Sequence, residues 1–165
     1  LPRRGRKMAG SINPQDAANS IITVLNSGMT AKLAALDTSY GDGITLDTVN
    51  AYWRAPQEQY PGKVNIIVVP TSTEAINSPD QREINYISIE VIVTGSQSSS
   101  TYSGTEMITI RLWRTCRAVQ ELLNKTTLSD AVDQCYIERI DASEIGADGT
   151  QFEQRAEVQL EVYTS

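Results

Sequence analysis

The chain has 165 residues, 40% of them hydrophobic and 21% charged, with 14 basic and 20 acidic side chains. This length and composition predict one globular domain that buries a core without metal ions or disulfide bonds. The chain has no histidine, so the commonest general base and metal ligand are both missing. Cys116 and Cys135 form no CxxC pair, and we expect both to be reduced and buried, although a disulfide between them also fits the sequence. We therefore expect no catalytic residues, no metal site and no cofactor.

The chain begins with a basic segment. Its cations are Arg3, Arg4, Arg6 and Lys7. Because Met8 resembles a natural start, residues 1–7 are interpreted as an expression remnant or an upstream extension, and residues 1–11 as a flexible basic extension before a single domain at 12–165. A signal peptide requires an apolar segment after its basic residues, and none follows here. The chain also has no run of about 18 apolar residues, so no membrane span is predicted. Without those four cations, 10 basic residues face 20 acidic ones, which argues against general affinity for nucleic acid.

Two segments have helical periodicity. The first begins at Asn13-Pro14, a favourable helix start, and apolar residues then recur every three or four positions over roughly residues 14–37. Gly28 in its middle predicts a bend or a break. The second helix is expected from about Gly104 to Asn124, after a serine-rich loop.

The remaining regular segments are predicted to be strands. Alternating or β-branched residues mark Thr48–Arg54 (weakly), Lys63–Val69, Ile84–Thr94, Val132–Ile140 and Phe152–Tyr163. Pro70 is expected to end the second of these, with a polar loop over Thr71–Gln81. Because strands and helices do not alternate as βαβ units, the prediction is an α+β fold. It has an antiparallel or mixed sheet of about four to five strands, with two main helices packed on one face.

The final strand has the clearest pattern. Residues of one parity from Phe152 are mostly apolar, whereas Glu153, Glu157 and Glu161 share the other parity. Successive side chains of a strand point to opposite faces, so one face is predicted to be buried and the other acidic. Paired acids can act in general acid–base catalysis, but no apolar pocket is predicted around these three to raise their pKa values. A solubilising face or an acidic wall is the better interpretation.

Three arginines recur every three residues on the second helix, at positions Arg111, Arg114 and Arg117. This spacing predicts that they lie along one helical face. One interpretation is a solvated row that pairs with acids such as Glu106 or Glu121. The other is a contact between subunits, since arginine is enriched at interfaces. Trp53 is likewise interpreted as a core or interface residue.

The order of elements over residues 12–164 resembles that of the tail terminator, or tail-completion, proteins of long-tailed bacteriophages. The features that carry this resemblance are the opening helix ending near Leu36-Asp37, the extended segment Val49–Pro56, the proline-ended strand Val64–Pro70, the strand Ile84–Thr94, the helix Thr105–Asn124 and the hairpin Tyr136–Tyr163. The resemblance covers most of the chain and includes no diagnostic short motif.

The resemblance implies a structural protein of the virion that assembles in the host cytoplasm. Such proteins form a hexameric ring that caps the tail tube, ends its polymerisation and presents the surface that joins the head. Their partners are copies of themselves, the tail tube protein and head–tail connector or neck proteins, with no membrane and no cofactor. Genomic DNA passes through the lumen without specific binding. We expect some of Glu153, Glu157 and Glu161, or acids in the loops, to line that passage. Arg111, Arg114, Arg117 and Trp53 are candidates for the subunit interface.

Three alternatives remain open at this point. A head–tail connector or neck protein has a similar organisation. A monomeric module that binds a peptide through an open sheet edge would also fit the predicted sheet. A small α+β enzyme is disfavoured by the absence of histidine and of catalytic motifs.

Overall fold

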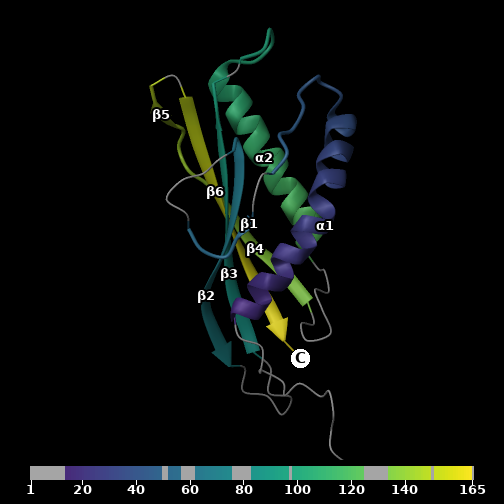
Figure 1. The fold of residues 1–165 in the computed structure, drawn as a ribbon, viewed down its shortest axis with the longest axis vertical. Coiled ribbons are helices and arrows are strands. Elements are labelled where there is room, and N and C mark those ends of the chain that lie inside the picture. The colour runs from purple at the N-terminus through teal and green to yellow at the C-terminus, as the bar shows by residue number, and fades with distance from the viewer. Residues whose placement is uncertain are drawn as a thin grey trace, which may run out of the picture.

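The computed structural model describes residues 14–49, 52–56, 62–75, 83–96, 98–124, 134–149 and 151–164. Two helices cover one face of a six-stranded sheet (Figure 1). The elements in chain order are α1 (Pro14–Tyr40), β1 (Tyr52–Trp53), β2 (Val64–Ala75), β3 (Glu83–Gly95), α2 (Gly104–Leu123), β4 (Gln134–Ala142), β5 (Gly146–Asp148) and β6 (Gln151–Thr164). The predicted basic extension lies outside the described residues.

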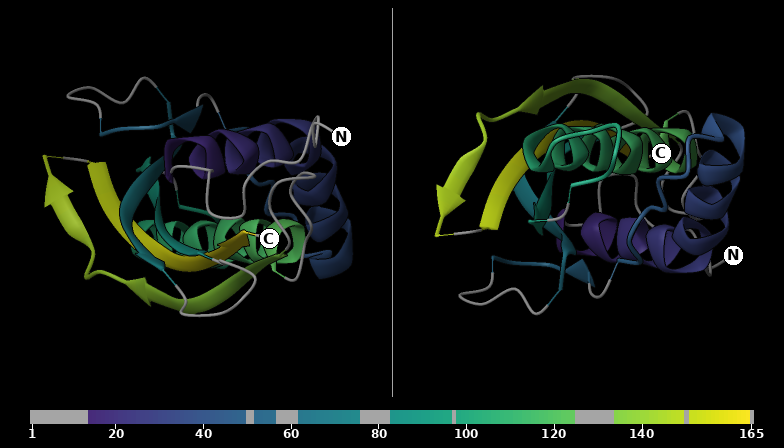
Figure 2. Two further views of the ribbon diagram at one scale, coloured as in Figure 1. Left: turned by 90° about the horizontal axis from the view of Figure 1, so that it is seen from below. Right: turned by 90° about the horizontal axis from the view of Figure 1, so that it is seen from above.

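The sheet has the strand order β1-β2-β3-β6-β4, and β5 pairs with β6 beyond the end of β4. Neighbouring strands are antiparallel except β1, which runs parallel to β2. The predicted α+β class and mixed sheet are therefore confirmed, and the short β5 brings the number of strands above the expected four to five. Figure 2 shows the sheet curving around the helices, with β4 far from β1.

The core lies between the helices and the inner face of the sheet. Alternate residues of β3 and β6 point inward and meet in register, as Ile89 does with Val158 and Ile87 with Leu160. The apolar stripes of α1 and α2 pack onto these strand residues. Leu25 and Leu112, which belong to the stripes, are fully buried. The alternation predicted for the final strand is thus confirmed, because its apolar parity is the buried one.

Helix α1 is continuous over its 27 residues, and its two halves run in different directions (Figure 2). At Gly28 the helix approaches α2 so closely that a Cβ atom would lie 2.6 Å from Cδ2 of Leu122. Next to it, the Ser27 hydroxyl donates to the carbonyl of Val24 at 3.1 Å. Glycine–serine pairs and such side-chain bonds are common causes of helix bending. The predicted bend is therefore present, without a break.

Helix α2 begins at a serine cap that our sequence prediction missed. The Ser103 hydroxyl accepts a hydrogen bond from the backbone N–H of Glu106 at 3.3 Å and donates to the Glu106 carboxylate at 3.0 Å. The spacing Ser-x-x-Glu is a known signature of a helix start. It fixes the first turn of α2 at the end of the serine-rich segment.

The prediction that Pro70 ends its strand is wrong, because β2 continues through it to Ala75. β1 pairs only with Ile66 and Ile67, so Pro70 lies on an unpaired edge where its missing N–H breaks no ladder. A bulge follows at Thr71, whose hydroxyl donates to the Tyr86 carbonyl at 2.9 Å. The predicted loop is thus strand as far as Ala75, and residues 76–81 lie outside the described part.

The other edge of the sheet is also interrupted. Along β4 the register with β6 shifts between Ile137 and Arg139, which leaves Glu138 as an extra residue. Bulges and charged residues at an edge hinder the addition of a further strand. Both long edges of this sheet therefore carry a feature that protects them.

Candidate functional site

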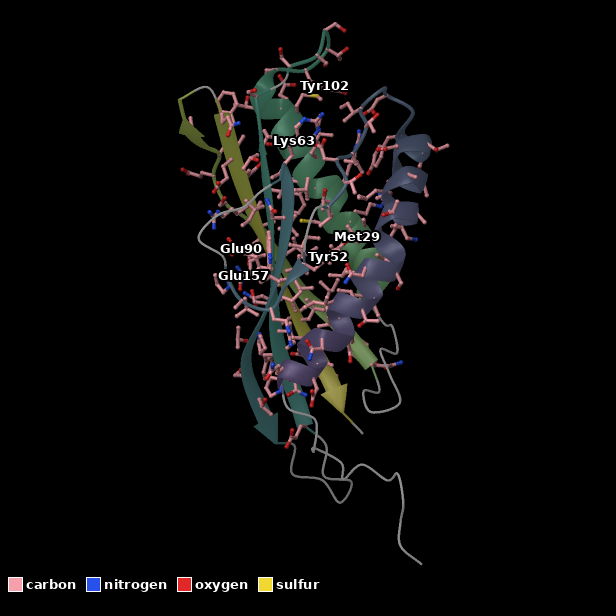
Figure 3. All side chains as sticks on the ribbon, in the orientation of Figure 1. Met29, Tyr52, Lys63, Glu90, Tyr102 and Glu157 are labelled. Carbon is pink, nitrogen blue, oxygen red and sulfur yellow. The ribbon has the colours of Figure 1, made fainter. Side chains whose placement is uncertain are left out.

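The outer face of the sheet, opposite the helices, carries a row of carboxylates. Glu90 of β3, Glu157 of β6 and Asp141 of β4 stand directly opposite one another in register. Figure 3 labels Glu90 and Glu157, which lie together on this face. Glu157 and Asp141 are exposed and Glu90 is half-buried. Like charges directly opposite each other repel, so this row is held together by the fold around it.

Two arginines offset part of that charge. Arg155 bridges Glu153 and Glu90, with nitrogen–oxygen distances of 2.6 and 2.9 Å, and Arg139 pairs with Asp141 at 2.7 Å. Glu157 accepts hydrogen bonds from the neutral side chains of Ser88 and Gln159, at 3.1 and 3.4 Å. It has no ion pair with any other described residue. Among the described residues, carboxylates therefore outnumber cations on the outer face, and neither Glu157 nor Glu161 is paired with a cation.

Tyrosines from three neighbouring strands occupy the other half of the outer face. The Tyr86 hydroxyl donates to Glu74 at 2.8 Å, and this bond raises the pKa of Tyr86 to about 12. The Tyr163 hydroxyl donates to Glu161 at 2.8 Å, which likewise raises the pKa of Tyr163. Tyr136 and Tyr163 pack edge to face, with ring centroids 5.6 Å apart. The phenols of Tyr86 and Tyr163 therefore stay neutral at physiological pH, and the one of Tyr163 orients the predicted lumen residue Glu161.

The outer face is not uniformly open. Ile67 and Ile92 lie on it and are fully buried, next to Asn65, which is buried as well. The Asn65 amide donates to the Gly62 carbonyl at 2.9 Å, while its side-chain oxygen has no hydrogen-bond partner among the described residues. Ile92 shares the outer parity of Glu90, and the sequence alone gives no sign of its burial. The exposed, acidic part of the face therefore belongs to β6, β4 and the middle of β3.

Two of the three predicted arginines are buried within the subunit. Arg114 makes a two-point ion pair with Asp42 and stacks on the Tyr40 ring, 3.9 Å from its centroid. Arg111 lies 3.5 Å from the Asp47 carboxylate. Both arginines are only 7% exposed, so the interpretation of a solvated row is wrong for them.

These pairs connect the segment after α1 to α2. The segment carries Ile44 and Leu46, which are both buried. The hydrogen bond with Arg114 is the main cause that holds the pKa of Asp42 below its ordinary value. The local sequence Gly41-Asp42-Gly43 is typical of a turn and gives no indication that its carboxylate pairs with α2.

Arg117 is the exposed arginine of the three. It pairs with Glu121, one helical turn away, at 3.1 Å, as one of the two interpretations expected. It also donates a hydrogen bond to the Tyr40 hydroxyl at 3.4 Å. The role of the three arginines and of Trp53 in a subunit contact stays a prediction. Trp53 is half-buried on β1, where it stands opposite Ile67.

A groove between α2 and the edge strand β4 was not predicted from the sequence. Trp113, 44% exposed, stands on its α2 side, and Ile140 stands on its β4 side. The other lining residues are Cys116, Arg117, Gln120 and Glu121. An exposed tryptophan beside a hollow is a common feature of contact surfaces.

The two cysteines are free and buried, as expected, and burial raises the pKa of each thiol to about 12. They are therefore unreactive at neutral pH. Among the described residues, no group of histidine, cysteine, aspartate or glutamate is placed to hold a metal ion. Within that same part of the chain, no helix is long and apolar enough to cross a membrane.

No family model matches the chain, and a search of curated proteins finds no similar sequence. Among solved structures, a chain of the virion of a native gene transfer agent particle is similar in fold. It is 13% identical, with a TM-score of 0.47, over 86% of this chain and 95% of that chain.

Proposed function

We propose that this chain is a structural subunit of a phage-like particle, namely a tail terminator. Its copies would form a hexameric ring that caps the tail tube, ends polymerisation of the tube and provides the surface for joining the head. The observation that carries the proposal is the acidic row of Glu90, Glu157 and Asp141 on a sheet face that no helix covers. A channel wall of this kind repels DNA phosphates, so that a genome slides past without being held.

The layer arrangement supports a ring. Cyclic symmetry turns the same face of every subunit toward one axis, so a single acidic sheet face becomes a continuous lining. Both long sheet edges carry bulges, at Thr71 and Glu138, and Pro70 removes a donor from one of them. Peptide binding by strand addition needs a regular edge with free donors and acceptors. The alternative of a monomeric peptide-binding module is therefore disfavoured.

A head–tail connector is the second candidate, because its channel also passes DNA and the same acidic face suits it. The two roles differ in their neighbours. A terminator binds the end of the tail tube, whereas a connector binds the head. Binding to purified tail tubes, in competition with DNA-filled heads that lack tails, distinguishes the two.

The first test is the mass of the protein in solution and on tubes. We expect a species of about six times 18.1 kDa by light scattering, with a ring visible by negative-stain microscopy. Added to polymerising tail tube protein, it is expected to shorten the tubes in proportion to its concentration. A protein that stays monomeric both alone and in the presence of tail tubes would contradict the proposal.

The second test concerns the lining. Reversing two charges with Glu157→Lys and Glu161→Lys is expected to make the assembled ring retain DNA, with retention lost between about 50 and 200 mM salt. The matched control is Asn26→Lys with Thr30→Lys, which adds positive charge to exposed positions of α1. Retention is measured by a shift in DNA mobility. DNA binding by the unaltered ring, or equal retention by the control, would contradict an acidic lumen.

A further inference from the structure

We infer that the ring closes by a head-to-tail contact between the two ends of the sheet, with the α2–β4 groove of one copy receiving the β1–β2 end of the next. This inference rests on the proposed function and names its subunit interface. We call the surface formed by the groove and the β4 edge the groove side. The surface that presents Arg54 and Lys63, which flank β1 and β2, is called the basic side.

The groove side has the shape and chemistry of a contact surface. Its hollow measures about 390 Å³ and is bounded by Trp113 and Ile140. Trp113 and Tyr40 are the exposed large hydrophobic residues of the described chain. Tyr40 already stacks on Arg114 within the subunit, so Trp113 is the one whose ring is left beside an open hollow. Tryptophan in such a position commonly dominates the energy of a contact.

The two sides carry opposite charges, and no other described residue forms an ion pair with them. Glu138 of β4 and Glu144, which follows that strand, are exposed, and neither forms an ion pair with another described residue. At the other end of the sheet, Arg54 and Lys63 are exposed and have no ion pair within the described part of the chain either. Complementary charges across an interface set its register and favour the correct partner. Here both halves of that complement occur on one chain, which points to a second copy as the occupant.

The position of the two sides makes the contact head-to-tail. The strand order places β4 and β1 at opposite ends of one curved sheet (Figure 2). A contact between unlike surfaces repeats from copy to copy, and it forms a ring when the rotation closes. The bulge at Glu138 interrupts any backbone ladder across the junction, so we expect side chains to supply most of the contact. The outer face is left free by this contact and faces the axis.

Charge reversal on either side tests the inference. Variant A carries Arg54→Glu and Lys63→Glu, and variant B carries Glu138→Lys and Glu144→Lys. Each variant alone is expected to need at least about a tenfold higher concentration than the unaltered protein to form rings, because like charges then meet at every junction. A 1:1 mixture of A and B is expected to restore the ring, since every A–B junction again pairs opposite charges.

The controls are Asn26→Glu with Thr30→Glu for variant A, and the corresponding lysine pair for variant B, all at exposed positions of α1. Mass is measured by light scattering, and folding by circular dichroism and thermal unfolding. The inference is overturned if A or B assembles like the unaltered protein, or if two folded variants fail to recover in the mixture. Should the unaltered protein form no ring at all, alone or on tail tubes, the proposed function itself fails.

Discussion

Replacing Val158 by aspartate is expected to prevent folding of this chain. Val158 is fully buried in the middle of β6, where it stands between Ile89 of β3 and Ile140 of β4. A carboxylate there has neither a cation nor water, and removing an unpaired ion from water costs several kcal/mol even after the protein relaxes, on the order of the 5–15 kcal/mol that stabilises a typical domain. The measurement is soluble yield together with circular dichroism.

The adjacent residue provides the matched control. Glu157→Lys changes a side chain on the opposite face of the same strand, and it replaces the central charge of an acidic row. We expect this variant to fold with an unchanged or slightly higher melting temperature, because repulsion from Glu90 and Asp141 is relieved. Equal tolerance of both substitutions, or loss of folding in both, would contradict the assignment of the inner and outer faces.

This contrast also shows how far the sequence determines the fold. The alternation from Phe152 onward was sufficient to predict which face of β6 is buried, because the period of a strand fixes the direction of each side chain. Helix α1 was predicted within three residues of its end for the analogous reason, since its apolar stripe is long and regular. Patterns that extend over many residues are thus read reliably from one sequence.

Features that depend on distant partners were missed. A proline ends a strand only where a neighbouring strand needs a backbone N–H from that position. Only the pairing of β1 shows that Pro70 lies on an edge, where no such donor is needed. Arg114 and Asp42 are 72 positions apart, and no local pattern indicates that they meet. The groove beside Trp113 likewise forms between elements that are adjacent only in space. The candidate acidic face was predictable from one strand, whereas the row with Glu90 and Asp141 required the register of three.

Arg114→Ala is expected to lower the melting temperature by about 5 °C at neutral pH, because the variant loses a buried, two-point ion pair and the stacking on Tyr40. The remaining carboxylate of Asp42 is partly hydrated, with 24% of its side chain exposed, which limits the loss. Arg117→Ala is the matched control, one helical turn away. Its side chain is 56% exposed, so little change is expected.

The pH dependence of the difference in melting temperature between the unaltered protein and Arg114→Ala shows whether the charge or the packing of Arg114 stabilises the fold. Arg114 holds the pKa of Asp42 below its ordinary value of 3.8, so the stabilisation from this carboxylate is complete above that value. It is lost as the pH falls through the lower pKa of the folded protein, where Asp42 becomes protonated. The gap in melting temperature between the unaltered protein and Arg114→Ala is therefore expected to be constant from pH 8 to about pH 5 and to narrow below about pH 4. A gap that stays constant under acid conditions would show that Arg114 stabilises the segment after α1 by packing on Tyr40 and not by its charge.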